Sequence, residues 1–433
     1  MNGAVDSPAK PSFGEAVRTW LRIGLLSFGG PTAQIALMHK IVVDEKRWLD
    51  EKTYLSALGF CMLLPGPEAQ QLATYAGWRL HGLKGGLAAG LLFVLPGAAV
   101  VLALAMIYSA FGKLPVVEAV FLGIKAAVLV IVIEALLRIS RRALKREMHW
   151  VIAGLSFVTI FFLGLPFPLI VLATAVFGYL SSEPAPDAPT APMPMVSAAA
   201  TVRTIFAGLA IWIVPLAALA AIFGRDHVTT QLSWFFSKLA VVTFGGAYAV
   251  LAYMAQDVVQ RSHWLEAGQM MDGLGLAETT PGPLILVTEF VGYLAAFRHG
   301  GVPAIGMGMV GAFVALWATF APCFLWIFAG APYIEWMTSQ PRLKGALEAI
   351  TAAVVGVILN LAVWFGLHVF FVEVTPLSWG PLQLWLPSVG TLDWRVVALA
   401  VLSGWLLLWR HWSVPAVLTA AAALALAARL AVL

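Results

Sequence analysis

The chain has 433 residues, of which 61% are hydrophobic and 11% are charged, and its formal net charge is +4. A soluble domain carries roughly 25% charged residues, so this composition excludes an ordinary soluble protein. Apolar runs of about 20 residues, the length that crosses a bilayer, recur along the chain. They predict an all-α polytopic protein of the lipid bilayer. The small net charge indicates membrane orientation rather than binding to nucleic acid.

The first part of the chain predicts a polar lead followed by a transporter module. Residues 1–12 contain no apolar stretch behind a basic start, so we expect a disordered lead and no cleaved signal peptide. The first module covers residues 13–181, with predicted spans at about 15–43, 54–78, 86–110, 117–138, 149–163 and 167–181. Five Lys and Arg residues between 138 and 146 predict a cytoplasmic segment and hence a cytoplasmic N-terminus.

The second part of the chain begins with a flexible connector at 182–200, which is rich in Pro, Ala and Ser. A second module over 201–372 has predicted spans at about 202–223, 231–255, 268–296, 302–328 and 345–371. A loop at 372–394 leads to a C-terminal pair of spans at about 395–410 and 413–432, within residues 373–433. The prediction is about 13 transmembrane helices.

An internal repeat organises this plan. The motif Phe28–Pro31 recurs at Phe244–Ala247, and Leu64–Pro67 recurs at Thr280–Pro283, both after 216 residues. Farther along, Pro96 and Pro322 are 226 residues apart. Four predicted spans belong to the first copy and three more, up to 202–223, separate it from the second copy of the motifs. This odd number predicts that the two copies have inverted topology.

The repeated motifs predict broken helices. Pro and Gly inside an apolar run interrupt the helix, and the freed backbone groups are tolerated where they are buried in protein or line a wet cavity. Half-helices that start at these breaks direct their N–H groups at the gap and favour an anion. The alternative is a set of simple kinks, but four breaks in register favour a site. The candidate binding residues of the breaks are Gly29, Gly30, Pro31, Pro65, Gly66, Pro67, Gly245, Gly246, Pro281, Gly282 and Pro283.

Polar side chains near the breaks are further candidates for substrate binding. The neutral donors are Gln34, Gln70, Gln71, Thr279 and Thr280, with hydrogen bonding between helices as the alternative. Lys125, near the middle of the fourth span, is a candidate substrate or coupling residue. Its alternative role is a structural ion pair with Glu68, Glu134 or Glu289.

Four charged residues are candidates for coupling or gating. Glu68 follows the first Pro-Gly-Pro directly, and Glu278 precedes the second; either carboxylate is a proton carrier or only a charge near a helix start. Arg22 and Arg79 are candidates for steering an anion at the cytoplasmic mouth. An arginine that snorkels at the end of a span is the alternative.

No enzyme or metal pattern is present in the sequence. The eight histidines are scattered, and Cys61 and Cys323 lie in apolar surroundings without metal-ligand spacing. We therefore expect no catalytic residue, no metal and no cofactor. A membrane enzyme that acts on a lipid phosphate would need a cluster of His, Asp or Arg at the interface, and no such cluster is seen.

The motifs of both copies resemble the signature of the chromate ion transporter family. The residues that carry the resemblance are Phe28–Pro31, Ala33–Ile35, Trp48, Leu63–Pro67, Ala69–Gln70, Tyr75, Gly77, Phe244–Gly246, Tyr248, Val250, Trp264–Leu265, Pro281–Pro283 and Gly292–Tyr293. The resemblance covers about residues 13–372, and the length is similar to that of long-chain members. One departure is Ala247, which stands where the first copy has Pro31.

The resemblance implies export of chromate across a bacterial inner membrane, and hence chromate resistance. Sulfate, a tetrahedral dianion of similar size, is the expected competitor or alternative substrate. We expect alternating access around a site at the repeat interface, with an anion channel as the rival mechanism. The sequence does not decide whether the protein forms a homodimer. An inside-negative potential favours outward movement of a dianion, so a coupled ion is not strictly required.

Overall fold

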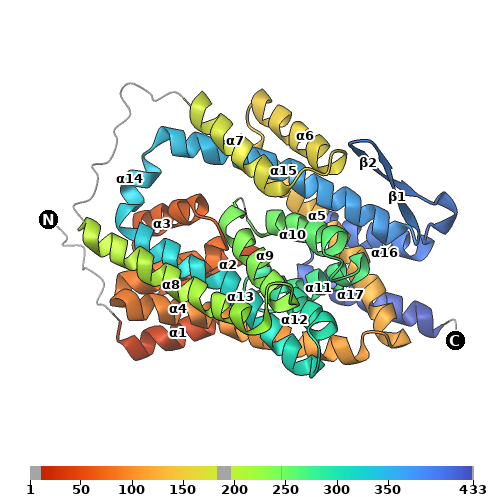
Figure 1. The fold of residues 1–433 in the computed structure, drawn as a ribbon, viewed down its shortest axis with the longest axis horizontal. Coiled ribbons are helices and arrows are strands. Elements are labelled where there is room, and N and C mark those ends of the chain that lie inside the picture. Colours follow the sequence, from red (N-terminus) through yellow and green to blue (C-terminus); the bar gives the residue numbers. More distant parts are fainter. Residues whose placement is uncertain (1–10, 183–196, 245, 432–433) are drawn as a thin grey trace.

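The computed structural model describes residues 11–182, 197–244 and 246–431. Most of the polar lead, most of the connector and the candidate residue Gly245 lie outside the described residues. The first half contains α1 (Phe13–Leu26), α2 (Gly30–His39), α3 (Glu51–Leu63), α4 (Glu68–Phe111), α5 (Pro115–Ala143), α6 (Glu147–Phe161) and α7 (Phe167–Ser181) (Figure 1).

The second half of the chain has more elements. Its helices are α8 (Ala198–Phe223), α9 (Val228–Val242), α10 (Ala247–Ala255), α11 (Ala267–Thr279), α12 (Val287–His299), α13 (Ala304–Gly330), α14 (Ile334–Thr338), α15 (Pro341–Phe370), α16 (Trp394–Gly404) and α17 (Val414–Leu430). Single turns of 3-10 helix lie at Leu284–Leu286, Ala331–Tyr333 and Val389–Thr391, and π-helical turns lie at Lys40–Glu45, Gln256–Arg261 and Trp405–Trp409.

The membrane-protein class is confirmed, whereas the number of spans stays a prediction. Among the described residues, five helical segments are long and apolar enough to cross a membrane: Glu68–Phe111, Pro115–Ala143, Ala198–Phe223, Ala304–Thr338 and Pro341–Phe370. Shorter apolar helices lie at 147–161, 167–181, 394–409 and 414–430. A helix of 15 residues is only about 22 Å long, less than the roughly 30 Å of hydrocarbon.

Helix α4 is two helices that fold back on each other. The backbone leaves helical geometry at His81 and Gly82, where Gly82 has a φ of +61°. The two arms then touch, since a Cβ at Gly77 would lie 2.3 Å from the carbonyl oxygen of Gly85. The loop predicted near residues 79–84 is therefore a tight turn between two antiparallel arms.

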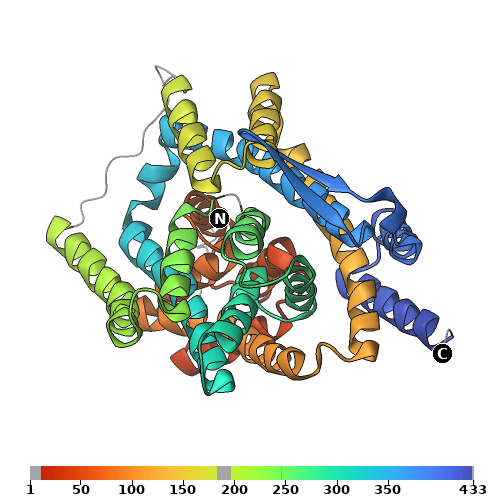
Figure 2. The same cartoon turned by 45° about the vertical axis from the view of Figure 1, so that its right-hand side comes forward.

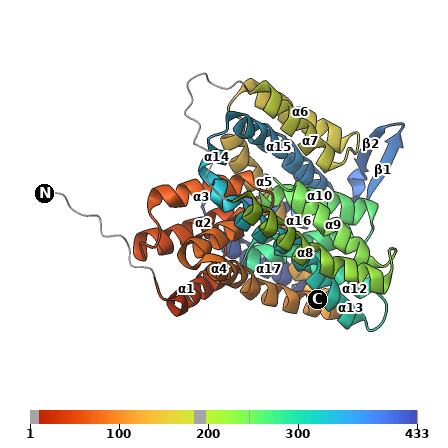
Figure 3. The same cartoon turned by 60° about the vertical axis from the view of Figure 1, so that its left-hand side comes forward.

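A β-hairpin lies in the segment 372–394, where the sequence predicted a loop between helices. Strands β1 (Val374–Trp379) and β2 (Leu382–Pro387) pair antiparallel, with Trp379 opposite Leu382. Gly380, with a φ of +61°, makes the turn. The hairpin lies beside the tip of α6 and α7 (Figures 1 and 3), and the Gln383 N–H donates to the Phe162 carbonyl at 2.7 Å.

The repeat is visible in the backbone. Helices α3 and α11 begin and end at equivalent positions of the two copies, and so do the π-helical turns after α2 and α10. Each π-helical turn is followed by a left-handed residue, Arg47 at φ +52° and His263 at φ +51°. The breaks predicted before α2, α4, α10 and α12 are all present.

The last two helices are a second copy of α6 and α7. Helices α6 and α7 begin at Glu147 and Phe167, and α16 and α17 begin at Trp394 and Val414, so the interval between the two starts is the same in both pairs. Gly164 and His411 occupy equivalent places in the two pairs, and both have positive φ, at +60° and +54°. The next N–H in each case donates to a carbonyl six residues back. In the sequence, only hydrophobicity marks this C-terminal pair.

The two short helix pairs are exchanged between the halves. Helices α6 and α7 pack on α15, whereas α16 and α17 pack on α5 (Figure 2). Glycines allow the close approach: a Cβ at Gly356 of α15 would lie 2.1 Å from the Ala153 carbonyl, and one at Gly123 of α5 would lie 2.2 Å from the Ala421 carbonyl. The short helix pair of each half therefore packs on the long helix of the other half.

Helices α5 and α15 run antiparallel. Thr351, near the start of α15, lines the same pocket as Arg138, near the end of α5. Gly366, near the end of α15, faces Leu129 farther back on α5. We call the end of the molecule with Arg138–Arg146 and the start of α15 the basic end, and the end with the turn Gly112–Leu114 the opposite end.

Candidate anion site at the crossing of the broken helices

Two reciprocal hydrogen bonds join the halves at the breaks. The Gly66 N–H donates to the Thr243 carbonyl at 2.9 Å, and the Gly282 N–H donates to the Ser27 carbonyl at 2.8 Å. Both the donors and the acceptors are 216 residues apart, so one bond is the repeat image of the other. Each Pro-Gly-Pro loop is thereby anchored on the helix end that precedes the other half's Gly-Gly break.

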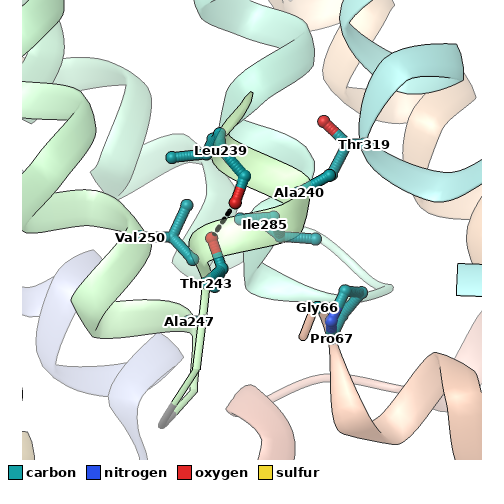
Figure 4. A pocket seen from close by; sticks show the side chains of 9 residues that line it. All are labelled: Gly66, Pro67, Leu239, Ala240, Thr243, Ala247, Val250, Ile285 and Thr319. Carbon is teal, nitrogen blue, oxygen red and sulfur yellow. Dashed lines mark hydrogen bonds between the residues drawn. The ribbon is translucent and has the colours of Figure 1, made fainter. Parts of the chain in front are cut away.

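We use the term crossing for the contact of the two Pro-Gly-Pro loops, at Gly66 and Gly282, with the helix ends at Thr243 and Ser27. This contact requires glycine. Gly66 and Gly282 have φ of +111° and +92°, a region that favours glycine. A Cβ at Gly66 would lie 2.9 Å from the Cys323 sulfur, and one at Gly97 would lie 2.1 Å from the Pro281 carbonyl oxygen. Figure 4 shows Gly66 and Pro67 near Thr243, whose hydroxyl bonds back to Leu239, and the space left here is only about 10 Å³. The crossing is close-packed.

An open pocket of about 190 Å³ lies beside the crossing, towards the basic end. It brings together the starts of α2 and α10, the first Pro-Gly-Pro loop with the start of α4, the end of α5 and Thr351 in the first half of α15. Its lining includes Pro31, Thr32, Cys61, Met62, Leu64, Gly66, Glu68, Arg138, Ile139, Arg142, Gly246, Ala247, Tyr248 and Thr351. Residues of both halves that the sequence predicted therefore meet around one cavity.

The pocket has the electrostatics of an anion site. Helices α2, α4 and α10 all begin at its wall, and their first N–H groups carry partial positive charge. Arg138 and Arg142 add two full charges from successive turns of α5. Arg138 contacts Glu134 at 3.3 Å, whereas Arg142 has no carboxylate within 4.0 Å among the described residues. Glu68 is the one carboxylate in the lining.

The repeat images of two lining residues are bonded to each other, and one of the images, Tyr248, also lines the open pocket. Tyr248 and Glu278 are the images of Thr32 and Met62, and the Tyr248 hydroxyl donates to Glu278 at 2.9 Å with both residues buried. By contrast, Thr32 is exposed and Met62 is 62% exposed.

Aromatic residues occupy the positions in the second half that are equivalent to Arg138 and Arg142, and their rings pack together. Trp364 stands at the position of Arg138 and His368 at that of Arg142, both after 226 residues. Their rings are 4.2 Å apart, and Trp385 of β2 lies 5.5 Å from His368. The second half thus has packed aromatic rings where the first half has two arginines.

The predicted amide and hydroxyl donors hold the breaks rather than line the pocket. Gln34 donates to the Gly282 carbonyl at 2.6 Å, and Gln71 donates to the Pro65 carbonyl at 2.7 Å. The remaining donors have short-range partners: Gln70 donates to Thr74, Thr279 to Leu276 and Thr280 to Ala277. Gly29 and Gly30 have φ of +85° and +76° and form the turn before α2.

Lys125 lies elsewhere. It is 13 residues before Arg138, about 20 Å along α5. Its ammonium is 3.4 Å from Asp272, which also accepts a hydrogen bond from Tyr108 at 2.7 Å. None of the three partners predicted for Lys125 was right, because the helix that faces it is α11, whose position the sequence does not reveal.

A second cavity opens at this ion pair. The pocket of about 440 Å³ at the opposite end includes Lys113, Lys125, Asp272 and Arg298 in its lining. Arg22 and Arg79 are exposed and line neither this pocket nor the one at the basic end.

Sequence reasoning missed Arg138 and Arg142 as site residues. Within the sequence they serve only as a mark of membrane orientation. Their spacing of four residues, which places both on one face of the span that also carries Lys125, was the available signal.

Comparison with known proteins decides the family. The family model described as "Chromate transporter" matches residues 14–179 and 230–427. This chain belongs to the chromate transporter family. The second match extends through α16 and most of α17, in agreement with their equivalence to α6 and α7. The family is one of transporters rather than enzymes.

Curated relatives agree with the chromate transporter assignment. A "Chromate transport protein" of Pseudomonas aeruginosa is 32% identical over 358 residues, which is 81% of this chain and 80% of the relative. A protein with the same description from Cupriavidus metallidurans is 30% identical over 364 residues, 83% of this chain and 84% of its own. An "Uncharacterized transporter", YwrA of Bacillus subtilis, matches 36% of this chain but 89% of its own length. No solved structure matches the chain.

Proposed function

We propose that this chromate transporter exports chromate across the inner membrane of a bacterium and thereby confers chromate resistance. The relatives named for chromate transport supply the substrate. The observation that carries the proposal is the cavity of about 190 Å³ where three helix starts meet Arg138 and Arg142. Helix starts and guanidinium groups are the donors that a tetrahedral dianion requires. Sulfate offers the same charge and shape, so it is the alternative or competing substrate.

The residues divide into two roles in this proposal. Those that face the cavity attract and bind the anion: the N–H groups of Thr32 and Ala247, with the side chains of Arg138 and Arg142. Those of the crossing keep the helices broken: Gln34, Gln70, Gln71, Thr279 and Thr280, with the two Pro-Gly-Pro loops. Arg22 and Arg79 steer the anion on the surface of the basic end.

Alternating access is the transport mechanism that we infer for two inverted modules. Such modules can exchange conformations, so that the site between them opens towards each side of the membrane in turn. The antiparallel course of α5 and α15 and the reciprocal bonds at Gly66 and Gly282 support this plan. The many cations of the basic end support placing it, with the N-terminus, in the cytoplasm.

Energy for export is available from the membrane potential. Moving a dianion outward through 100 mV releases about 5 kcal/mol, at about 2.3 kcal/mol per charge. Two carboxylates are placed to carry a proton if one is exchanged: Glu68, which lines the open pocket, and Glu278, which accepts the hydrogen bond from Tyr248. Lys125, about 20 Å from the pocket along α5, acts at the exit.

Uptake into inverted membrane vesicles tests the proposal. Labelled chromate and sulfate are supplied while the potential and the proton gradient are varied separately. We expect saturable chromate uptake that sulfate inhibits and that Gly29→Leu abolishes. Counterflow, in which unlabelled chromate inside accelerates entry of label, separates a carrier from a channel. Absence of energised uptake of either anion would overturn the substrate, and flux without counterflow would overturn alternating access.

A further inference from the structure

A third cavity, of about 430 Å³, lies at the basic end and is separate from the anion pocket. It is enclosed by α6, α7 and the start of α15. Its lining includes Arg146, Met148, His149, Ile152, Phe177, Gly178, Ser181, Ser182, Pro341, Lys344, Gly345, Glu348 and Ala349. It shares no residue with the anion pocket.

One wall of this cavity is cationic. Arg146 and Lys344 both line it, and among the described residues neither has a carboxylate within 4.0 Å. The N-terminal end of α15, a helix of 30 residues, lies at this wall with Pro341 and Lys344 in the lining, and its dipole adds partial positive charge. Glu348, one turn farther along α15, is the one carboxylate in the lining. Two unpaired cations beside a helix start provide a phosphate-type site.

The rest of the cavity is apolar and faces the side of the molecule. Ile152, Phe177 and Ala349 line this apolar part. On α6 next to it, Trp150 is 63% exposed and Val151 is 51% exposed, as expected for a surface that contacts lipid chains. A ligand that fits both parts has an anionic head and an apolar body.

The repeat provides an internal control for the charge. The position equivalent to Arg146 in the other half is Asp393, 247 residues later, and the position equivalent to Lys344 is Glu118, 226 residues earlier. At the opposite end Asp393 is paired with Arg395 at 2.8 Å. The same backbone therefore carries cations at one end and carboxylates at the other. Anionic lipids give the cytoplasmic leaflet a negative surface, which matches this difference.

We propose that the cavity binds the phosphodiester headgroup of an anionic phospholipid from the leaflet at the basic end. Arg146 and Lys344 hold the phosphate, and the acyl chains follow the apolar wall of α6 and α7. Since Arg146 precedes α6 and Lys344 belongs to α15, the lipid joins the exchanged helix pair to the long helix. This inference does not depend on which anion is transported.

Thermal unfolding of the full-length protein in detergent tests this site. Short-chain phosphatidylglycerol is titrated against the wild type and against Arg146→Gln/Lys344→Gln, with short-chain phosphatidylcholine as the neutral lipid. We expect phosphatidylglycerol to raise the unfolding temperature of the wild type. The double variant should need about 30-fold more lipid for the same shift, because each basic residue near the surface contributes about fivefold.

A matched control removes two charges from the opposite end. Lys113→Gln/Arg225→Gln should keep the wild-type response to phosphatidylglycerol. If the double variant at the basic end does not fold, Lys344→Gln alone should show a shift of about fivefold. Equal stabilisation of the wild type and Arg146→Gln/Lys344→Gln would overturn the proposal. So would an equal effect of phosphatidylcholine, or saturation by inorganic phosphate without lipid.

Discussion

The two halves of the chain form the same backbone but surround the crossing with different side chains. In the first half Thr32 and Met62 leave an open pocket under Arg138, whereas in the second half their images Tyr248 and Glu278 are bonded to each other at 2.9 Å. In our proposal the broken helices place the anion site in both halves alike. The side chains that differ between the copies then make the two halves unequal around it.

The largest loss of stability and transport is expected from disrupting the contact between a Pro-Gly-Pro loop and the other half, a feature that both halves have. Gly66→Ala introduces a Cβ at positive φ and 2.9 Å from the Cys323 sulfur, so it displaces the Pro-Gly-Pro loop from its bond with Thr243. We expect a loss of roughly 1–3 kcal/mol of stability and no transport, measured by thermal unfolding and vesicle uptake. Gly59→Ala, which meets nothing within 4 Å, is the control and should behave as the wild type.

The next effect concerns an ion pair found in one half only. Lys125→Met leaves the carboxylate of Asp272 buried in the protein without its cation, and we expect a cost of about 3 kcal/mol in unfolding. Lys125→Met/Asp272→Asn should recover most of the stability. If transport stays lost in the stable double variant, Lys125 has a role in anion movement; if transport recovers, Lys125 is purely structural.

A smaller effect is expected from removing the hydrogen bond between Tyr248 and Glu278, which we propose stabilises the state open at the basic end. Tyr248→Phe removes the hydrogen bond to Glu278, which favours the state open at the opposite end by about tenfold at roughly 1.4 kcal/mol. Labelling of Met62→Cys from the basic end by an impermeant maleimide should become slower. The control is Tyr54→Phe, which removes another buried tyrosine bond, to the Ile35 carbonyl, without touching the gate. An unchanged labelling rate in Tyr248→Phe would show that this bond is not the gate.

The smallest loss of stability is expected at Asp393, the residue before α16, which is equivalent to Arg146 before α6. Asp393 caps α16 and bonds the Arg395 guanidinium, which holds the pKa of this carboxyl below its ordinary value of 3.8. Its stabilisation is therefore complete above about pH 4 and is lost as the pH falls through the lowered pKa. Asp393→Ala should cost about 1 kcal/mol at pH 7 and less below pH 3, as measured by denaturant unfolding.

Local chemistry made the breaks predictable from the sequence. Pro and Gly interrupt a helix wherever the chain places them, so the motifs at residues 28–31 and 64–67 and their copies located the crossing. The partners of charged side chains were not predictable in this way. Lys125 pairs with Asp272, which is far from it in the sequence, and that contact depends on how α5 packs against α11. The same holds for Arg138 and Arg142, whose place in the pocket follows from the antiparallel course of α5 and α15.

Two features were missed because their sequence signals are weak. The β-hairpin lies in a segment with Pro376, Pro381 and Pro387, residues that usually argue against strands. Pro381 is in the turn, Pro387 is the last residue of β2, and Pro376 lies inside β1. The equivalence of the last two helices to α6 and α7 rests on helix starts and on Pro168 and Pro415, at the second position of each. Their remaining residues are interchangeable apolar side chains.

Equilibrium binding of radiolabelled chromate to the purified protein tests the central claim most directly. The comparison is between the wild type, Arg138→Gln/Arg142→Gln and the control Arg141→Gln, which removes a charge between them that does not line the pocket. We predict saturable binding to the wild type and the control, displaced by sulfate, and binding at least roughly 100-fold weaker in the double variant, because each hydrogen bond to a charged group contributes about 1.5–3 kcal/mol. Equal affinity of all three proteins for chromate would contradict the anion site proposed between the broken helices.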